Sequence, residues 1–443
     1  MAATLPFGLQ AFNRSNAFVP EVELLNWYVE KDQSGVVEGG YLRIQRPGLS
    51  TITVLPDIIR GVFEQSGVLF GNRYAVAGSN LWNVSANNSM GDIGNDGGMV
   101  EFAATYFGLY VLSAGQIYYT DGVTRTPIAS PDNRLFVSID TLNSYIIALC
   151  ADGRWYWIEP ASVTIDPLNF ATAESSPDGG VAIRRLVDEA WFFGASTVEP
   201  WQATGDADAP FQRASGRVYD RGCLSRDTVR RFDNGIIWVG DDGIVYRTSN
   251  VPQAVSTNGI EERIARRSGA LSAFQFDTNG HKFYALKIPG QGDFAYDARE
   301  QGWTQLASPN NTAWRPWVGY GSVCASKDDG TIWLMGDTVP GDDGVAFRRA
   351  ATATIPLSGK PQRNPSLSID IGLSADAQMR LRWRDSDESF PDYWEEHDLT
   401  APVDNLNQRR MGQIRSPFRT FEIETTALAT VSLWAASLGD AWD

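Results

Sequence analysis

A short pattern recurs along most of this chain: an apolar strand, a turn rich in Gly, Asp or Asn, and a second strand rich in aromatic residues. Gly and Asn permit the positive φ angles that tight hairpin loops need, and β-branched or aromatic flanks suit pleated strands. The pattern therefore predicts β-hairpins. They are expected at residues 74–82, 109–119, 145–157, 190–199, 235–246, 282–296 and 322–333.

The spacing of these hairpins predicts the architecture. Their centres lie roughly 35 to 50 residues apart, the period of a β-propeller blade, in which one hairpin supplies half of a four-stranded sheet. Six or seven blades of that size fit residues 40–350. Because the units share little sequence, a double β-sandwich remains the alternative all-β architecture.

The rhythm changes after residue 350. The segments 367–373, 379–384, 419–424 and 429–434 alternate apolar and polar residues, as strands do in an antiparallel sheet with one face in water. We therefore expect three parts. They are an N-terminal arm at 1–39, a β-propeller at 40–350, and a C-terminal all-β domain resembling a sandwich or barrel at 351–443.

Charge and composition exclude several classes of protein. The net charge of −16, from 53 acidic and 37 basic residues, argues against a protein that coats DNA by contacting its phosphates. The N-terminus has no basic start with an apolar core after it, and no apolar stretch of about 18 residues occurs, so neither classical secretion nor membrane insertion is predicted. Cys150, Cys223 and Cys324 are expected to be buried, reduced thiols in a protein that folds in the cytosol.

Catalytic and cofactor motifs are not found. The sequence has no phosphate-binding loop, no dinucleotide fingerprint and no zinc-protease motif, and we predict no catalytic residue, cofactor or metal. The two histidines, His281 and His397, are expected to be polar surface residues. The acidic turns 241–243, 328–330 and 342–344 lack the spacing of a calcium loop and are interpreted as hairpin turns.

One of these turns suggests the functional alternative. Ser326–Trp333 resembles the Asp-box of sialidase-type propellers, in which Asp closes a hairpin onto backbone amides and the aromatic residue packs between strands. That motif is structural, so it supports a propeller without indicating catalysis. A carbohydrate-binding or glycoside-cleaving propeller would still need an aromatic-lined cleft with two converging carboxylates.

Several segments resemble the packaged-DNA stabilisation, or tail hub, proteins of podovirus-type phages. The segments near the start are Gly40-Tyr41-Leu42-Arg43, Pro47-Gly48, Arg60-Gly61-Val62, Tyr74-Ala75-Val76 and Leu81-Trp82. The most specific pair is Glu174-Ser175-Ser176-Pro177-Asp178-Gly179 followed by Phe193-Gly194-Ala195-Ser196-Thr197-Val198-Glu199. Near the end, Arg410-Met411-Gly412-Gln413-Ile414-Arg415 precedes Phe418 and Phe421. The order of these segments is the family's order along almost the whole chain.

The resemblance implies a structural virion protein and no catalytic residues. It implies a homo-hexameric ring in the phage tail, assembled in the host cytoplasm below the head-to-tail adaptor and portal. Such a ring closes the head-to-tail channel, lets double-stranded DNA pass without specific binding, and meets a tail needle, fibre or spike. Six copies would carry 6 × −16 = −96 charges, which predicts an acidic lumen.

Two places are candidate contacts with another subunit or partner. Glu199 ends the Phe-Gly-x-Ser-Thr-x-Glu segment, whose alternative interpretation is a central pair of strands without a contact role. Arg409, Arg410, Arg415 and Arg419 form a basic cluster in an acidic protein. They either form a solvated face that balances nearby acidic residues or dock on an acidic partner.

Overall fold

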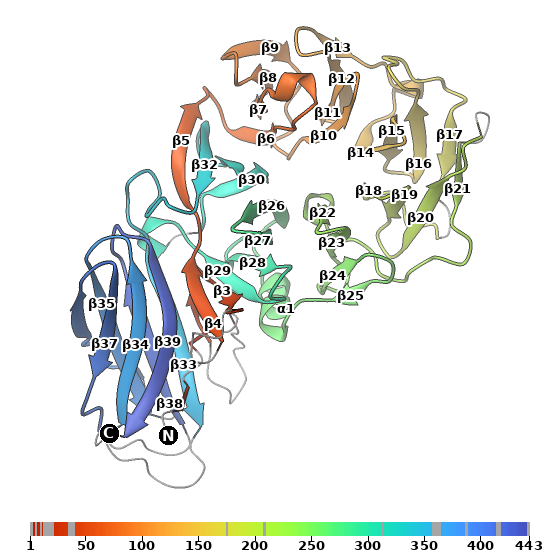
Figure 1. Ribbon diagram of the computed structural model, residues 1–443. Helices are drawn as coiled ribbons and strands as arrows, with labels where there is room; N and C mark the ends of the chain where they lie inside the picture. Colours follow the sequence, from red (N-terminus) through yellow and green to blue (C-terminus); the bar gives the residue numbers. More distant parts are fainter. Residues whose placement is uncertain are drawn as a thin grey trace.

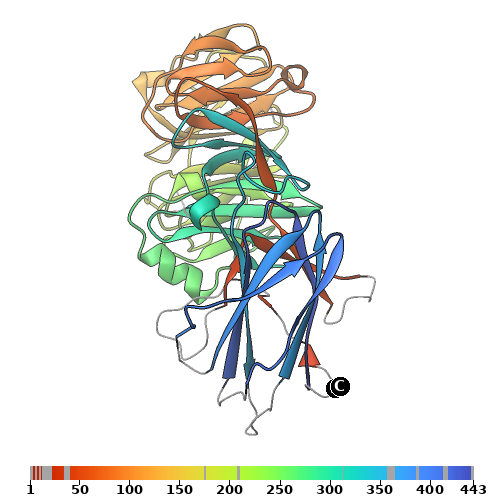
Figure 2. The ribbon, with the colours of Figure 1, turned by 90° about the vertical axis from the view of Figure 1, so that its left-hand side faces the viewer.

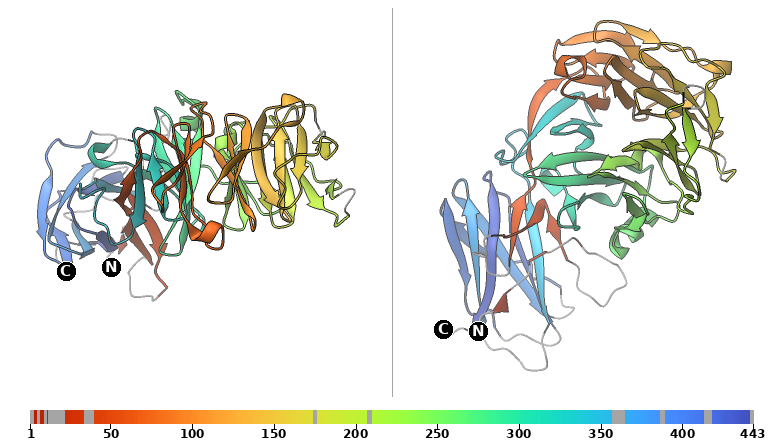
Figure 3. Two further views of the ribbon diagram at one scale, coloured as in Figure 1. Left: turned by 90° about the horizontal axis from the view of Figure 1, so that it is seen from above. Right: turned by 45° about the vertical axis from the view of Figure 1, so that its right-hand side comes forward.

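The computed structural model describes residues 3–4, 7–8, 11, 22–33, 40–173, 176–206, 210–311, 313–356, 365–385, 389–412 and 418–440. β-strands form two parts, a ring of blades and a β-sandwich beside it (Figure 1). Views from other sides show the sandwich at the edge of the ring (Figures 2 and 3). The all-β fold class is confirmed.

The ring is a seven-bladed β-propeller within the described residues, with four antiparallel strands in each blade. Its blades are β6 (Ile59–Phe63), β7 (Tyr74–Ala77), β8 (Asn80–Asn83), β9 (Asn88–Asp92); β10 (Glu101–Thr105), β11 (Gly108–Ser113), β12 (Gln116–Thr120), β13 (Arg125–Pro127); β14 (Phe136–Leu142), β15 (Tyr145–Cys150), β16 (Arg154–Ile158), β17 (Phe170–Thr172); β18 (Ala182–Leu186), β19 (Glu189–Phe193), β20 (Val198–Ala203), β21 (Phe211–Arg213); β22 (Arg230–Phe232), β23 (Gly235–Val239), β24 (Val245–Thr248), β25 (Gln253–Ala254); β26 (Ser272–Thr278), β27 (His281–Ile288), β28 (Gly292–Asp297), β29 (Trp303–Leu306); and β30 (Pro316–Tyr320), β31 (Val323–Ser326), β32 (Thr331–Gly336), β5 (Gly48–Val54). The first strand of each blade lies nearest the axis (Figure 1).

All seven predicted hairpins are confirmed, and each one forms the second and third strands of a blade. The Asp-box turn is one of them. The carboxylate of Asp329 accepts a hydrogen bond from the backbone N–H of Thr331 at 3.1 Å, and Trp333 is fully buried. This turn is therefore a structural element, as the motif predicted.

The seventh blade closes the ring, because its fourth strand comes from the N-terminal side of the chain. β5 pairs with β32 along its length, and the backbone N–H of Leu55 donates to the carbonyl of Gly330 at 2.8 Å. A Cβ atom at residue 330 would lie 1.7 Å from the Leu55 carbonyl oxygen, so only glycine permits this approach. The strand that precedes the first blade thereby completes the last blade, which closes the ring.

The sandwich has two sheets that share a buried apolar core. One sheet has the order β3 (Trp27–Lys31), β4 (Tyr41–Gln45), β39 (Val431–Asp440), β34 (Pro365–Leu373), β37 (Val403–Gln408), with β1 (Ala3–Thr4) also on β39. The other runs β2 (Leu24–Leu25), β33 (Arg349–Pro356), β38 (Phe418–Thr425), β35 (Ala377–Asp385), β36 (Glu395–Leu399). The four predicted C-terminal strands correspond to β34, β35, β38 and β39.

The N-terminal strands differ from the predicted division of the chain at residues 39 and 40. β3 and β4 form a hairpin that joins the sandwich through β39, and β2 pairs with both β33 of the sandwich and β29 of the sixth blade. The sandwich therefore combines both ends of the described chain. The pairings of β2 with β33 and of β4 with β39 join residues more than 300 positions apart, which no local pattern indicates.

A buried arginine fixes the junction between the two parts. Arg46 is 2% exposed and donates to both carboxylate oxygens of Asp342, at 2.9 and 2.8 Å. It also donates to the side chain of Asn26 and to the carbonyl of Ala307, both at 2.9 Å, and its guanidinium lies 3.7 Å from the ring centre of Phe347. These hydrogen bonds of Arg46 fix the position of the sandwich on the propeller.

One face of β38 was expected to meet water but is buried. Glu422 and Glu424 are 3% and 4% exposed, because Arg348, Arg380 and Arg382 lie over them and form ion pairs with them. Arg348 binds both carboxylates, at 2.9 and 2.6 Å. The polar face of β38 therefore presents buried carboxylates that are covered by arginine side chains and paired with them.

Helical structure is confined to short connections. The described helices are α1 (Asn258–Ala265) and the 3-10 turns η1 (Leu69–Gly71), η2 (Pro131–Asn133), η3 (Arg226–Thr228) and η4 (Pro309–Asn311). No helix in the described ranges is long and apolar enough to cross a membrane. The three cysteines are free and buried, as predicted.

Candidate functional site

The centre of the propeller holds a buried ion pair that joins three blades. The Glu101 carboxylate at the start of β10 lies 2.5 Å from the Arg184 guanidinium in β18. Its other oxygen accepts hydrogen bonds from the hydroxyl of Ser138 and the N–H of Ile139 in β14, both at 2.8 Å. Burial raises the pKa of Glu101, but Arg184 and then Arg226 lower it further than burial raises it, so the carboxyl stays ionised.

Two more arginines close this layer on one side. Arg226 donates to the carbonyls of Met99 and Val137, at 2.8 and 2.9 Å, and Arg60 donates to the carbonyl of Gly98 at 2.8 Å. These acceptors lie in the segments that lead into the inner strands. Charged side chains therefore occupy the propeller axis on this side of the ring.

A pit remains on the other side of the ion pair. Its volume is about 140 Å³. The lining comes from all seven inner strands and consists of Val62, Glu101, Phe102, Ile139, Asp140, Arg184, Arg230, Arg231, Gln275, Gly319 and Tyr320. Three arginines and two carboxylates thus surround a recess on the propeller axis.

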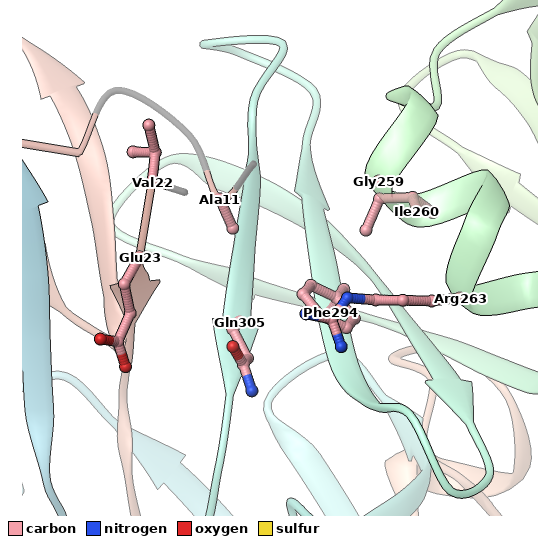
Figure 4. Close-up of a pocket in the computed structure, with 8 residues that line it drawn as sticks. All are labelled: Ala11, Val22, Glu23, Gly259, Ile260, Arg263, Phe294 and Gln305. Carbon is pink, nitrogen blue, oxygen red and sulfur yellow. The ribbon is translucent and has the colours of Figure 1, made fainter. Parts of the chain in front are cut away.

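A second pocket, of about 250 Å³, lies where α1 faces the sixth blade and the N-terminal segment (Figure 4). Arg263 reaches from α1 over the ring of Phe294, with 5.0 Å between the guanidinium carbon and the ring centre. The lining includes one carboxylate, Glu23, which pairs with Arg348 at 2.8 Å. The described lining therefore lacks the two converging carboxylates that the glycoside-cleaving alternative requires.

One face of the propeller carries large exposed apolar side chains. Turns between the first and second strands, and between the third and fourth, emerge on the same face of an antiparallel blade. The side chains in these turns, with exposed fractions, are Phe70 (99%), Tyr106 (88%), Val123 (82%), Leu168 (81%) and Val187 (75%). These side chains come from turns of the first four blades, so this face offers apolar contacts to another protein.

The most specific sequence motif stabilises a turn within the subunit. One carboxylate oxygen of Asp178 accepts hydrogen bonds from the backbone N–H groups of Ser196 and Thr197, at 2.8 and 2.7 Å, and from both hydroxyls. A Cβ atom on Gly194 would lie 2.4 Å from this carboxylate. The two halves of the motif therefore fix the central turn of the fourth blade, while Glu174 and Ser175 lie outside the described residues.

Some of the predicted contact residues are buried and others are exposed. Glu199 is 3% exposed and accepts a hydrogen bond from the indole of Trp201 at 2.9 Å, and Arg419 is 3% exposed and pairs with Asp385 at 2.6 Å. Neither side chain is presented to a partner by the single chain. Arg409 and Arg410 are exposed, and no ion pair among the described residues includes either of them. Arg415 lies outside the described part of the chain.

The prediction that His281 is a surface residue is wrong. His281 begins β27 directly after the Asn279–Gly280 turn, and its ring is fully buried against Tyr28 of the N-terminal hairpin. Its Nδ1 lies 2.6 Å from a carboxylate oxygen of Asp297. The turn was read correctly, but the covering strand comes from a distant part of the sequence. His397 is half-buried in β36.

The family model described as "Bacteriophage P22 Gp10, beta-propeller" matches residues 10–346. The chain belongs to this phage stabilisation family. It is therefore a phage structural protein that stabilises packaged DNA, and the resemblance found in the sequence is confirmed. The match covers the strands from β2 to β32, while β1 precedes it and the sandwich strands from β33 onward follow it.

Several solved structures are similar to this stabilisation protein at low sequence identity. They include U3-55K (9% identity, 66% of this chain, 99% of that chain, TM-score 0.44) and the WD40 β-propeller domain of Doa1 (11%, 66%, 97%, 0.42). The computationally designed Ika8 protein is also similar (12%, 75%, 98%, 0.40). No curated protein matches. The blade count given above rests on strand pairing alone.

Proposed function

We propose that this phage stabilisation protein is the hub, or nozzle, of a short phage tail. In this proposal a homo-hexameric ring sits below the head-to-tail adaptor, closes the channel on packaged DNA, and carries the tail needle, fibre or spike. The observation that supports it most is the family match over the whole propeller. The role is structural and uses no cofactor.

The rigidity of the molecule supports this role. A gate that holds pressurised DNA must resist deformation, and three features oppose it here. The ring is closed by β5, the axis is filled by the Glu101–Arg184 layer, and the sandwich is fixed to the ring through Arg46. Each feature joins segments distant in sequence, so local opening of one blade is opposed by its neighbours.

The exposed apolar face supports assembly with other proteins. The side chains of Phe70, Tyr106 and Val123 belong to the first two blades, in loops remote from the sandwich (Figure 1). Aromatic residues are enriched in protein interfaces, where they bury much area at little cost in conformational entropy. We assign this face to contacts with neighbouring subunits or with the adaptor.

The decisive experiment removes the protein from the phage. Particles assembled without it should package DNA and then lose it, so that their DNA becomes sensitive to nuclease, and added wild-type protein should restore retention. Electron microscopy of restored particles should show a six-fold ring below the adaptor. Particles that keep their DNA and a complete tail without the protein would refute the proposal.

A further inference from the structure

The pit on the propeller axis contains an arginine without an acidic partner. The guanidinium of Arg230 donates to the carbonyl of Val229 at 2.8 Å and to the sulfur of Met99 at 3.4 Å. Within the described residues no ion pair includes Arg230. The nearby carboxylate of Glu101 already forms an ion pair with Arg184 and does not pair with Arg230.

The charges around the pit do not balance. The groups in and beside the pit are four arginines against three carboxylates, which leaves one positive charge in excess: Arg184, Arg226, Arg230 and Arg231 against Glu101, Asp140 and Asp227. Burial, and then repulsion from Arg184, lower the pKa of Arg230 to about 10. The guanidinium is still ionised at neutral pH, and an uncompensated charge in a recess is costly unless an anion approaches it.

The pit has the size and the donors for such an anion. Liquid water occupies about 30 Å³ per molecule, so a volume of about 140 Å³ exceeds that of four waters and accommodates an oxyanion of five heavy atoms. Arg231 is exposed and adds a second guanidinium to the lining. The carboxylate of Asp140, which also lines the pit, accepts hydrogen bonds from the N–H groups of Thr141 and Arg185, at 2.7 and 2.9 Å.

We propose that this pit binds a small oxyanion, of which inorganic phosphate is the simplest probe, between the guanidinium groups of Arg230 and Arg231. Planar guanidinium groups match phosphate oxygens in geometry as well as in charge. The bound anion would neutralise the excess charge on the axis and join β22 to the opposite inner strands. The inference concerns the isolated subunit and does not depend on its place in the virion.

Calorimetric titration of the full chain with phosphate tests the site. The wild-type protein should show one saturable site, Arg230→Gln should lose it, and Arg231→Gln should bind more weakly. Arg221→Gln removes an exposed arginine of the same acidic protein outside the pit and should bind as the wild type does. Chloride at the same ionic strength is the blank. No saturable heat, or equal heats for wild type and Arg230→Gln, would overturn the proposal.

Thermal unfolding gives a second readout. Without phosphate, Arg230→Gln should be at least as stable as the wild type, because the change removes repulsion from Arg184. With phosphate, the wild-type Tm should rise more than that of the variant. Phosphate also stabilises proteins generally by exclusion from their surface, so an equal rise in both would contradict binding in the pit. If Arg230→Gln does not fold, the exposed Arg231→Gln variant decides by the same comparison.

Discussion

Replacing Arg46 by methionine should destabilise the junction between propeller and sandwich severely. Methionine keeps much of the side-chain length but donates no hydrogen bond and carries no charge. Asp342, which is 7% exposed, would then be a buried carboxylate without its cation. The acceptors on Asn26 and Ala307 would also lose their donor.

The size of the effect follows from these losses. Removing one partner of a buried ion pair costs about 3 to 5 kcal/mol, because the remaining charge stays desolvated. Arg73→Met is the matched control, since Arg73 pairs with Glu64 at the surface, with exposed fractions of 20% and 37%. Surface pairs of this kind contribute about 0 to 1 kcal/mol. Arg46→Met should therefore lower the free energy of unfolding several times more than Arg73→Met does.

Urea unfolding monitored by tryptophan fluorescence measures this difference, with limited proteolysis to locate the first region that opens. Adding Asp342→Asn to Arg46→Met should recover part of the loss, because no unpaired charge is then buried. If Arg46→Met costs no more than the Arg73 control, Arg46 does not hold the junction. If the double variant is as unstable as the single one, the unpaired carboxylate is not the cause.

Four further predictions can each be tested separately. Gly194→Ala should cost about 1 to 3 kcal/mol by forcing a methyl group against Asp178, whereas an unchanged urea midpoint would mean that the turn adapts. The folded pKa of Glu101 is depressed, so its stabilising contribution is complete above the unfolded pKa of about 4.3 and is lost as pH falls through the folded pKa. Glu101→Gln should consequently weaken the dependence of stability on acid pH. Charge reversal at Arg409 and Arg410 should reduce adaptor or fibre binding in pull-down assays, and unchanged binding would remove these residues from the interface. Duplex DNA should bind the isolated protein weakly at physiological salt in an anisotropy titration, and sub-micromolar affinity with a steep salt slope would contradict this.

The hairpins could be predicted because each is a local structure. Its two strands and turn lie within a few residues of one another, and both strands are apolar enough to be recognised. Several innermost and outermost strands are harder to recognise because they have three residues or fewer: β13, β17, β21, β22 and β25. β22, for example, has three residues and begins with Arg230 and Arg231, which look like a surface pair in sequence but line the pit.

The candidate site was largely invisible in the sequence for a related reason. Glu101 and Arg184 are separated by 83 positions and meet only because the ring brings the first strands of different blades to one axis. Arg46 and Asp342 are separated by 296 positions and meet only when the ring closes. Neither pair has a local signature. The motif from Asp178 to Thr197 was noticed, yet its purpose became clear only when the carboxylate was found on the turn.

The path of DNA in the proposed hub follows from where the arginines lie. A wall that grips DNA needs a row of free guanidinium groups facing the phosphates. Arg184, however, is bound to Glu101, Arg266 is bound to Glu262 at 2.6 Å, and Arg230 lies in the pit on the axis. In the proposed hexamer a duplex would then run between subunits, past the outer surfaces of their blades, because charged side chains occupy the propeller axis. Those surfaces belong to a chain with a net charge of −16, and fields from exposed charges decay over about 8 Å at physiological salt. If the surfaces that face the proposed channel share this negative charge, they repel a duplex at short range, which leaves its retention to closure of the channel.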